Sequence, residues 1–170
     1  MGSPKALLTL NGVSFADGLI SAFAPCDEVV VVLGHDAERI RSGIFLRTAR
    51  FVVNPNPERG QLSSLQCGLE AISDADAIFF TPVDYPAIHP RTVRLLLAHA
   101  GTFAMPRFEG RRGHPVLLDR KLAGELLLCE TNARDVIRAH DPVYVDVDDP
   151  GILEDVDDPV SYARLQECSR

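Results

Sequence analysis

The sequence predicts an α/β fold, with a doubly wound and mostly parallel sheet in a single domain over residues 1–170. Two observations predict it. Continuous apolar runs bounded by turn residues recur along the chain, as in strands buried on both faces. Helical patterns separate these runs, and such alternation favours right-handed crossovers in one sheet. With 170 residues, of which 46% are hydrophobic, the chain can bury a core without disulfides or a structural metal.

The predicted elements follow from local patterns. Apolar runs such as EVVVVL and AIFFT predict strands, and apolar positions spaced at i, i+3 and i+7 predict helices. Strands are expected at residues 28–33, 51–54, 77–81 and 143–147. Helices are expected at residues 15–23, 62–72, 93–100, 120–128, 133–139 and 160–167. Short apolar runs around the turn EGRRG predict a small β excursion at residues 103–118 rather than a βα unit.

Composition excludes several classes of protein. A net charge of −7, a pI near 5.1 and the lack of tryptophan disfavour nucleic-acid binding. No apolar run approaches the ~20 residues that span a bilayer, and the first residues lack a signal-peptide pattern, so we expect a cytoplasmic protein without a membrane partner. The four cysteines form no CxxC pair, which predicts free thiols.

Charge is concentrated in two places. Residues 141–158 hold eight acidic residues and no Lys or Arg, which indicates either a solvated face or a site for a hard divalent cation. A basic group contains Arg107, Arg111, Arg112 and His114. It either faces a polyanion such as a phosphorylated substrate or is ordinary surface charge. His114 itself suits a base, a substrate contact or a turn residue, and Pro115 fixes it in an extended conformation.

Ligands of doubly wound sheets bind beyond the carboxyl ends of the strands. This rule selects the loops at residues 34–36, 54–64 and 82–89. Asp84, held between two prolines in PVDYP, is the strongest functional candidate, with capping of the next helix as the alternative.

Two further candidates depend on helix ends and basic residues. Gly60, Ser63 and Ser64 stand at a helix start, where free N–H groups favour an anion or a polar ring, although a serine there can also act only as a cap. Lys5 is one of two lysines among 17 basic residues. It suits a point contact to phosphate, or it is an ordinary terminal lysine.

Taken together, six stretches resemble one family in order and spacing. They are MGSPKALLTLNG at 1–12, EVVVVLG at 28–34, NPERGQLSSLQCGL at 56–69, AIFFTPVDYPAI at 77–88, RRGHPVLL at 111–118 and DDPGILEDVDDP at 148–159. The sequence is similar to the MobA-like nucleotidyltransferases and looks most like the molybdenum cofactor cytidylyltransferases. The resemblance covers nearly the whole chain.

The resemblance implies a fold of the nucleotide-diphospho-sugar transferase type and a Mg²⁺-dependent transfer of CMP from CTP to a phosphorylated pterin cofactor, with release of pyrophosphate. Lys5 would contact the triphosphate, and Gly60, Ser63 and Ser64 would lie against the nucleobase. Asp84 and Asp157 would ligate Mg²⁺, with Lys5 and Asp84 as the catalytic residues. The pterin would face Arg112, Gly113, His114 and Pro115. A molybdoenzyme that receives the cofactor is the expected protein partner.

The sequence departs from the family pattern at its start. The family begins with a strand and a glycine-rich loop of LAAGxSxRMGxPK type, of which only MGSPK is present here. We therefore expect a domain that is N-terminally truncated relative to the family, with open edges on the strands at 28–33 and 77–81. Two smaller departures are ETNARDVI at 130–137 and Asp158, where a threonine is usual.

Other functions remain compatible with this pattern. A guanylyltransferase or a sugar-phosphate nucleotidylyltransferase would use the same fold, because fold does not fix the substrate. A non-catalytic module that binds or chaperones the cofactor is the alternative from another class.

Overall fold

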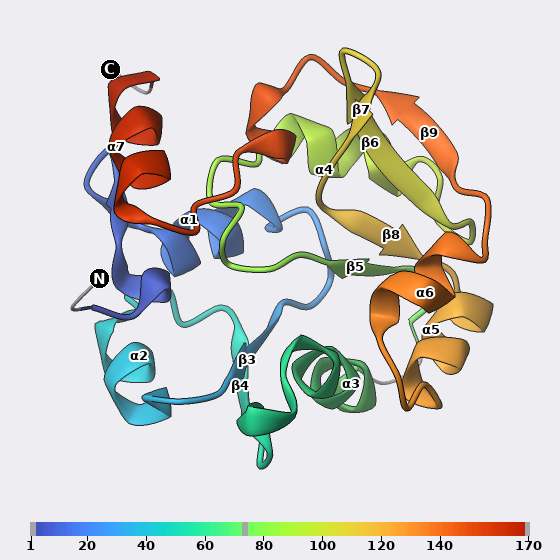
Figure 1. The fold of residues 1–170 in the computed structure, drawn as a ribbon, viewed down its shortest axis with the longest axis horizontal. Helices are drawn as coiled ribbons and strands as arrows, with labels where there is room; N and C mark the ends of the chain where they lie inside the picture. Colours follow the sequence, from blue (N-terminus) through green and yellow to red (C-terminus); the bar gives the residue numbers. More distant parts are fainter. Residues whose placement is uncertain (1–2, 73–74, 169–170) are drawn as a thin grey trace.

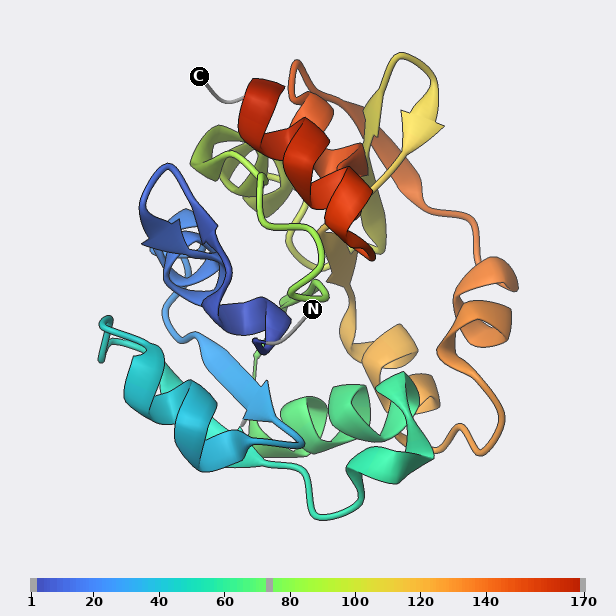
Figure 2. The same ribbon diagram turned by 60° about the vertical axis from the view of Figure 1, so that its left-hand side comes forward.

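The fold is an α/β arrangement in a computed structural model, which describes residues 3–72 and 75–168 (Figure 1). Within these ranges lie seven α-helices: α1 Phe15–Ala22, α2 Ala37–Gly43, α3 Gln61–Ala71, α4 Pro90–Leu97, α5 Arg120–Leu127, α6 Ala133–Arg138 and α7 Pro159–Cys168. Three 3₁₀ turns accompany them: η1 Lys5–Leu7, η2 Pro57–Arg59 and η3 Pro150–Leu153. The helices cover the strands from both sides (Figure 2).

The described strands form three separate ladders. A short hairpin pairs β1 Thr9–Leu10 with β2 Val13–Ser14, and β3 Val30–Leu33 runs parallel to β4 Arg50–Val53. The third ladder has five strands: β5 Ile78–Phe80, β6 Ala104–Phe108, β7 Arg111–Arg112, β8 Val116–Leu118 and β9 Val143–Asp146. Its spatial order is β5-β8-β6-β7, with β9 also paired to β6.

The sheet is mixed, and this corrects the prediction of a mostly parallel one. β8 is antiparallel to β5 and β6, and β7 is antiparallel to β6, while β9 is parallel to β6. The cause lies in the connections. Glu109 and Gly110, both with positive φ, form a tight turn that makes β7 antiparallel to β6. β8 follows β7 after three residues and continues in the same direction along β6, so it is antiparallel to β6 as well.

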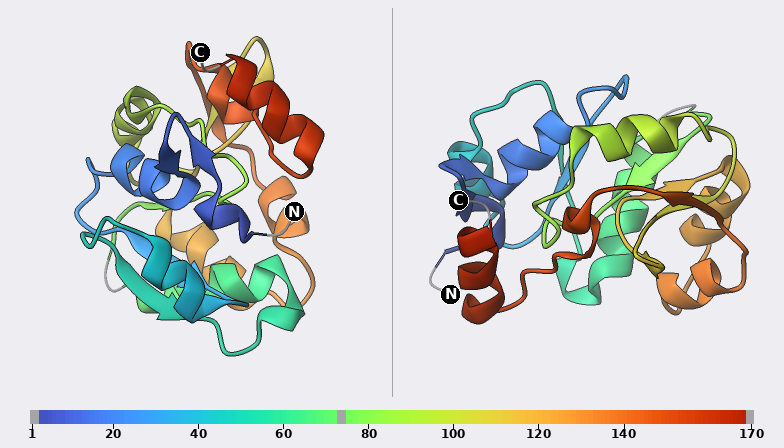
Figure 3. Two further views of the ribbon diagram at one scale, coloured as in Figure 1. Left: turned by 90° about the vertical axis from the view of Figure 1, so that its left-hand side faces the viewer. Right: turned by 90° about the horizontal axis from the view of Figure 1, so that it is seen from above.

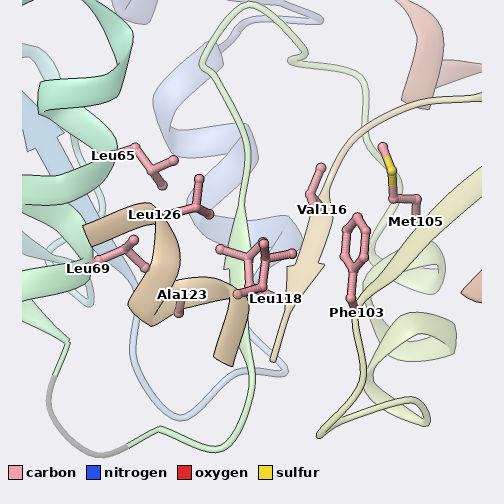
Figure 4. Packing of buried hydrophobic residues seen from close by; sticks show 9 residues of the cluster. Leu65, Leu69, Phe103, Met105, Val116, Leu118, Ala123 and Leu126 are labelled. Carbon is pink, nitrogen blue, oxygen red and sulfur yellow. The ribbon is translucent and has the colours of Figure 1, made fainter. Parts of the chain in front are cut away.

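The largest buried cluster holds the five-stranded sheet against α3 and α5 (Figure 4). Leu65 and Leu69 of α3 meet Leu122 and Leu126 of α5 on the face formed by Leu118. The α3 positions repeat at i and i+4, which explains the apolar periodicity of this segment. This packing orients α3 so that its first turn lies beside the loop at 54–60.

A second face is covered by α1 and α4. Phe23 of α1 lies edge to face with Phe79 of β5 at 5.6 Å between ring centroids. Val93 of α4 belongs to the same buried cluster. The loop between β5 and α4, which carries Asp84, is thus anchored at both ends by buried side chains.

All six predicted helices and all four predicted strands are present, with bounds shifted by up to three residues. The β excursion at 103–118 is present as β6, β7 and β8. The β1–β2 hairpin and α2 were not predicted. None of the helices in the described residues is both long enough and apolar enough to cross a membrane. The four cysteines are free thiols, as expected.

Candidate functional site

Three carboxylates, those of Asp84, Asp155 and Asp157, meet at one point of the structure. One oxygen from each lies within 4.8 Å of the others. Asp84 follows β5, whereas Asp155 and Asp157 follow η3 near the end of the chain. The amide of Val156 donates a hydrogen bond to the carbonyl of Asp84 at 2.9 Å, and the Val156 side chain is buried. Because this hydrogen bond and this burial fix the position of Val156, the aspartates on either side of it are held beside Asp84.

Lys5 supplies the positive charge of this cluster. Its Nζ lies 2.7 Å from Asp157 Oδ1 and 3.3 Å from Asp84 Oδ1. Partial burial by itself would lower the pKa of Lys5, but the hydrogen bond to Asp157 and the charge of Asp84 outweigh it and raise the pKa above its usual value. Lys5 is therefore a fixed cation at the site, with its side chain only 28% exposed.

Asp155 was not among the residues expected from the sequence. Burial raises its pKa, and the neighbouring charges of Asp157 and Asp84 raise it further. The hydroxyl of Tyr85 lies 3.4 Å from Asp155 Oδ2. The pKa of Tyr85 is raised as well, first by burial and then by the charge of Asp155. A usable signal was present in the sequence, because the spacing of Asp155 and Asp157 places both on one side of an extended segment.

The donor set fits a hard divalent cation. Three carboxylates face one ammonium group, so the cluster keeps an excess of negative charge. Oxygens on opposite sides of a Mg²⁺ ion are about 4.2 Å apart, given Mg–O distances of about 2.1 Å. The three oxygens lie within 4.8 Å of one another, close enough for side-chain rotations to bring them all to one ion. The alternative role of Asp84 as a helix cap does not hold, since His89 caps α4 through its side chain.

The loop before α3 is organised by a buried asparagine. Asn54 Nδ2 donates to Ser63 Oγ at 2.9 Å and to Ser64 Oγ at 3.1 Å, and Asn54 Oδ1 accepts from the amide of Asn56. Ser63 is buried, and its hydroxyl lies within hydrogen-bond distance of the carbonyls of Asn56 and Gly60. Ser63 therefore fixes the loop rather than presenting a free hydroxyl, which changes its expected role.

Gly60 and Ser64 have the exposure that a contact residue needs. Gly60 has φ of +83°, and a Cβ built on it would meet nothing within 4 Å. Ser64 is half-buried and lines a cavity that also reaches Lys5 and Asp84. Neither serine caps α3, because Gly60 occupies the N-cap position without a side-chain bond. Asn54, which sequence reasoning missed, is the residue that sets the shape of this loop.

The basic group gathers at the β6–β7 hairpin. Arg107, Arg111 and Arg112 line a cavity of about 510 Å³ together with Tyr144. Arg107 is engaged within the protein, since it makes a bidentate pair with Asp146 at 2.7 and 3.0 Å. Arg111 and Arg112 are exposed. The charge available to a ligand here therefore comes from the two neighbouring arginines of β7.

Gly113 has a packing role that differs from the one expected. A Cβ at this position would overlap the backbone carbonyl of Ile152, and the amide of the next residue, His114, donates to that same carbonyl at 3.0 Å. Glycine thus permits a close approach between the chain at this position and η3; the expected contact of Gly113 with the pterin stays a prediction. Pro115 is buried and follows a cis peptide bond.

His114 lies in an aromatic environment. Its ring is 4.4 Å from that of Tyr85 and 5.8 Å from that of Phe80. Among the described residues, its buried Nδ1 has no hydrogen-bond partner. Burial lowers the pKa of His114 to about 4, although a hydrogen bond with the Phe80 backbone opposes the shift. His114 is therefore neutral at physiological pH and does not offer a cation to a phosphorylated ligand.

This burial predicts a pH dependence of stability. Between pH 6.5 and pH 4 the unfolded chain protonates His114 and the folded chain does not, so stability falls as the pH drops through this window. This shift of the His114 pKa corresponds to a loss of about 3 kcal/mol in the free energy of unfolding. Urea unfolding of the wild type and of His114→Gln across this pH range tests the expected loss. The variant should show a shallower decline, and identical slopes for the two proteins would contradict the expectation.

A comparison with protein families identifies the fold. The family described as "MobA-like NTP transferase domain" matches residues 1–143. The chain belongs to the MobA-like NTP transferase family. The matched range includes Lys5, Asp84 and the loop before α3. Asp155 and Asp157 lie beyond it, so their place in the site rests on the geometry alone.

Several relatives of this MobA-like protein are known. Nicotine blue oxidoreductase of Paenarthrobacter nicotinovorans is 30% identical over 178 residues, covering 95% of this chain and 87% of the relative. The crystal structure of Rv0371c from Mycobacterium tuberculosis superposes with a TM-score of 0.87 at 26% identity, covering 98% of this chain and 90% of that one. A manganese complex of Rv0371c superposes with a TM-score of 0.82 at 25% identity, covering 98% and 93%.

A third structure shows the fold alone. It is described as a nucleotidyl transferase from Methanothermobacter, with a TM-score of 0.82, 24% identity, and coverage of 97% of this chain and 84% of that one. Family membership and fold together make this MobA-like protein a nucleotidyltransferase. The manganese complex of a relative and the acidic cluster of this chain both indicate that the site binds a divalent metal.

Proposed function

We propose that the protein transfers CMP from CTP to a phosphorylated pterin of the molybdopterin type and releases pyrophosphate, with Mg²⁺ as the metal. The observation that carries the proposal is the meeting of Asp84, Asp155 and Asp157 with Lys5 at the end of β5. Nucleotidyl transfer needs the charge of a triphosphate to be neutralised and its α-phosphorus to be positioned, and no protein nucleophile. The chain offers these groups in one place.

The reaction assigns a task to each of these groups. A phosphate oxygen of the acceptor attacks the α-phosphorus of CTP, and the bond from that phosphorus to the bridging oxygen breaks as pyrophosphate leaves with the electron pair. Asp84, Asp155 and Asp157 would hold the cation. A bound Mg²⁺ would polarise the phosphoryl oxygens and neutralise charge on the leaving group. Lys5 would exchange its carboxylate partners for triphosphate oxygens once the cation balances the carboxylates.

The two substrates would approach from different segments. The open Cβ side of Gly60 and the half-buried hydroxyl of Ser64 support a nucleobase contact at the loop before α3. The cavity beside Arg112 supports a contact to the anionic pterin substrate. A molybdoenzyme that accepts the product remains the proposed protein partner.

Replacing Arg112 by Ala should raise the KM for the phosphorylated pterin about tenfold and leave the affinity for CTP nearly unchanged, because a charge-assisted hydrogen bond to phosphate contributes about 1.5 kcal/mol or more. Steady-state kinetics with each substrate varied in turn measures both constants. Arg134→Ala on α6 removes the same charge from another exposed position and serves as the control. An equal loss for both substrates would contradict the assignment of Arg112.

A nucleotide panel tests the proposed function itself. CTP, GTP and ATP are each incubated with the purified chain, Mg²⁺ and molybdopterin, and pyrophosphate release is measured. Release with CTP alone supports the proposal. Release with GTP or with a sugar phosphate as the acceptor would favour the other transferases of this fold. Nucleotide binding by calorimetry without turnover would indicate a binding module, and a redox change of nicotine blue, followed by its absorbance, would point to the activity named for the relative from Paenarthrobacter.

A further inference from the structure

Tyr85 places a hydroxyl beside the acidic cluster. It follows Asp84 directly in the loop after β5, and its Oη lies 3.4 Å from Asp155 Oδ2. Within residues 3–72 and 75–168, Asp155 is the only hydrogen-bond partner of this hydroxyl. A tyrosine hydroxyl has one hydrogen to donate, and an ionised carboxylate can only accept. Tyr85 is therefore the donor in this contact, and Asp155 is the acceptor.

Asp155 differs from the other two carboxylates of the cluster in the side chain that contacts it. Lys5 forms ion pairs with Asp84 at 3.3 Å and with Asp157 at 2.7 Å. In the part of the chain that the structure describes, Asp155 is not an ion-pair partner of Lys5. Lys5 thus orients two of the three carboxylates, and Tyr85 is the residue in a position to orient the third.

The ring of Tyr85 is held by two groups of neighbours. It packs against the buried cluster of α1 and α4 that contains Phe23 and Val93. The ring of His114 lies 4.4 Å from it, tilted by 45°. Side chains in such close-packed surroundings have little room to change their rotamer. The hydroxyl of Tyr85 therefore keeps its direction toward Asp155.

His114 is fixed by the same segments that carry the carboxylates. Its amide donates to the carbonyl of Ile152 in η3 at 3.0 Å, and its ring forms a hydrogen bond with the backbone of Phe80 at the end of β5. Asp84 follows β5, and Asp155 follows η3. Figure 3 shows the segment after η3 beside the loop after β5. The support of the tyrosine ring therefore comes from the two segments that form the cluster.

A carboxylate that binds a metal ion depends on the groups that orient it. Removal of a group that hydrogen-bonds such a ligand commonly weakens metal binding by about 10- to 100-fold. An ionised carboxylate has about four lone-pair sites, so a bond from Tyr85 to Asp155 leaves others for a cation. Hydrogen bonds at such sites also shorten when the ligand binds. The contact between Tyr85 and Asp155 thus suits an orienting role.

We propose that Tyr85 is a positioning residue of the divalent-metal site and acts through Asp155. Its hydroxyl holds this carboxylate in the orientation in which it meets the cation together with Asp84 and Asp157. The inference rests on the metal site of the proposed function and adds a residue to it. In this role Tyr85 contacts neither the cation nor a substrate. It determines how tightly the cation binds rather than the chemistry of the transfer.

A double-mutant cycle tests whether Tyr85 acts through Asp155. Mn²⁺ binding is measured from the EPR signal of the free ion for the wild type, Tyr85→Phe, Asp155→Ala and the double variant. Tyr85→Phe keeps the ring and removes only the hydroxyl, and it should weaken Mn²⁺ binding about tenfold. In the Asp155→Ala background the same change should alter the affinity by less than about twofold, because coupled residues are not additive.

Tyr162→Phe is the matched control. It removes a hydroxyl that donates to the carbonyl of Thr9 at 2.8 Å, and Tyr162 is not one of the three residues of the acidic cluster. Both tyrosine variants should lower the melting temperature slightly, but only Tyr85→Phe should weaken Mn²⁺ binding. At saturating Mn²⁺, Tyr85→Phe should regain at least about half of the wild-type kcat, because excess metal compensates for a less well oriented ligand.

The possible results separate this inference from the proposed function. Equal Mn²⁺ affinities of the wild type and Tyr85→Phe would overturn the inference, whatever the change in melting temperature. A tenfold loss that persists in the Asp155→Ala background would also overturn it, since Tyr85 would then act by another route. A wild-type chain that binds Mn²⁺ without turning over CTP would contradict the proposed function and leave the cycle valid. A wild-type chain that binds no Mn²⁺ would overturn both.

Discussion

Replacing Asp84 by Asn should lower the rate of nucleotidyl transfer by about a thousandfold and weaken Mn²⁺ binding strongly. Asp84 belongs to the acidic cluster and contacts Lys5, as Asp157 does, and it comes from the loop after β5. Loss of one preorganised charged group at such a site costs about 3–4 kcal/mol of transition-state stabilisation. Pyrophosphate release and Mn²⁺ titration by calorimetry measure the two effects.

The fold should survive this change. Asn has the size of Asp, and the contact that anchors Val156 uses the backbone carbonyl of Asp84 rather than its side chain. Asp148→Asn provides the matched control, because Asp148 is exposed in the same acidic segment and lies outside the cluster. If Asp84→Asn kept the turnover and the metal affinity of the wild type, Asp84 would not be part of the site. If both variants lost activity and metal affinity equally, the effect would come from the overall negative charge of the segment and not from Asp84 itself.

Gly151→Ala should destabilise the protein by about 3 kcal/mol and weaken metal binding at the same time. A Cβ at Gly151 would overlap the backbone carbonyl of Ala87 and approach Asp149 Oδ1 to 2.9 Å. Asp149 cannot turn away, because its buried carboxylate accepts bonds from the amide of His89 and the hydroxyl of Thr92. Overpacking against fixed backbone costs a few kcal/mol, and here it also pushes η3 away from the loop of Asp84.

A second glycine gives the control for this substitution. Gly124 lies in α5, and a Cβ there would meet nothing within 4 Å. Gly124→Ala should therefore stabilise the protein by up to about 1 kcal/mol, as alanine does in an open helix position. Urea unfolding of both variants measures the difference. A Gly151→Ala variant as stable as wild type would show that η3 can move, contrary to the packing described.

The elements that local patterns determine were predictable. The spacing of Leu65 and Leu69 predicted α3, and the apolar runs predicted β3 and β5, because burial of these side chains decides the local structure. Asp84 and Asp157 lie 73 positions apart in the sequence and were predicted by a strand-end rule and by resemblance, and the structure brings them together. Their function as metal ligands stays a prediction.

Features that depend on distant contacts were not predictable in the same way. The contact of Gly113 with Ile152 joins residues that no local pattern connects, so the packing role of this glycine could not be predicted. The direction of β8 follows from the tight turn between β6 and β7, after which β7 and β8 both run antiparallel to β6, rather than from its composition. The β1–β2 hairpin is different, since Asn11 and Gly12 carry a recognisable turn signal, with φ of 52° and 81°. This turn is therefore one that local sequence can predict.

The ion pair between Lys5 and Asp157 joins residues 152 positions apart. Beside it, the hydroxyl of Tyr162 in α7 donates to the carbonyl of Thr9 at 2.8 Å, so the end of the chain closes over its beginning. Contacts of such long sequence separation form late in folding, because the largest loop must close to make them. During synthesis, a nascent chain can bury much of its core before the last acidic residues leave the ribosome. The acidic cluster therefore forms only after the segment of Asp155 and Asp157 has joined the rest of the fold.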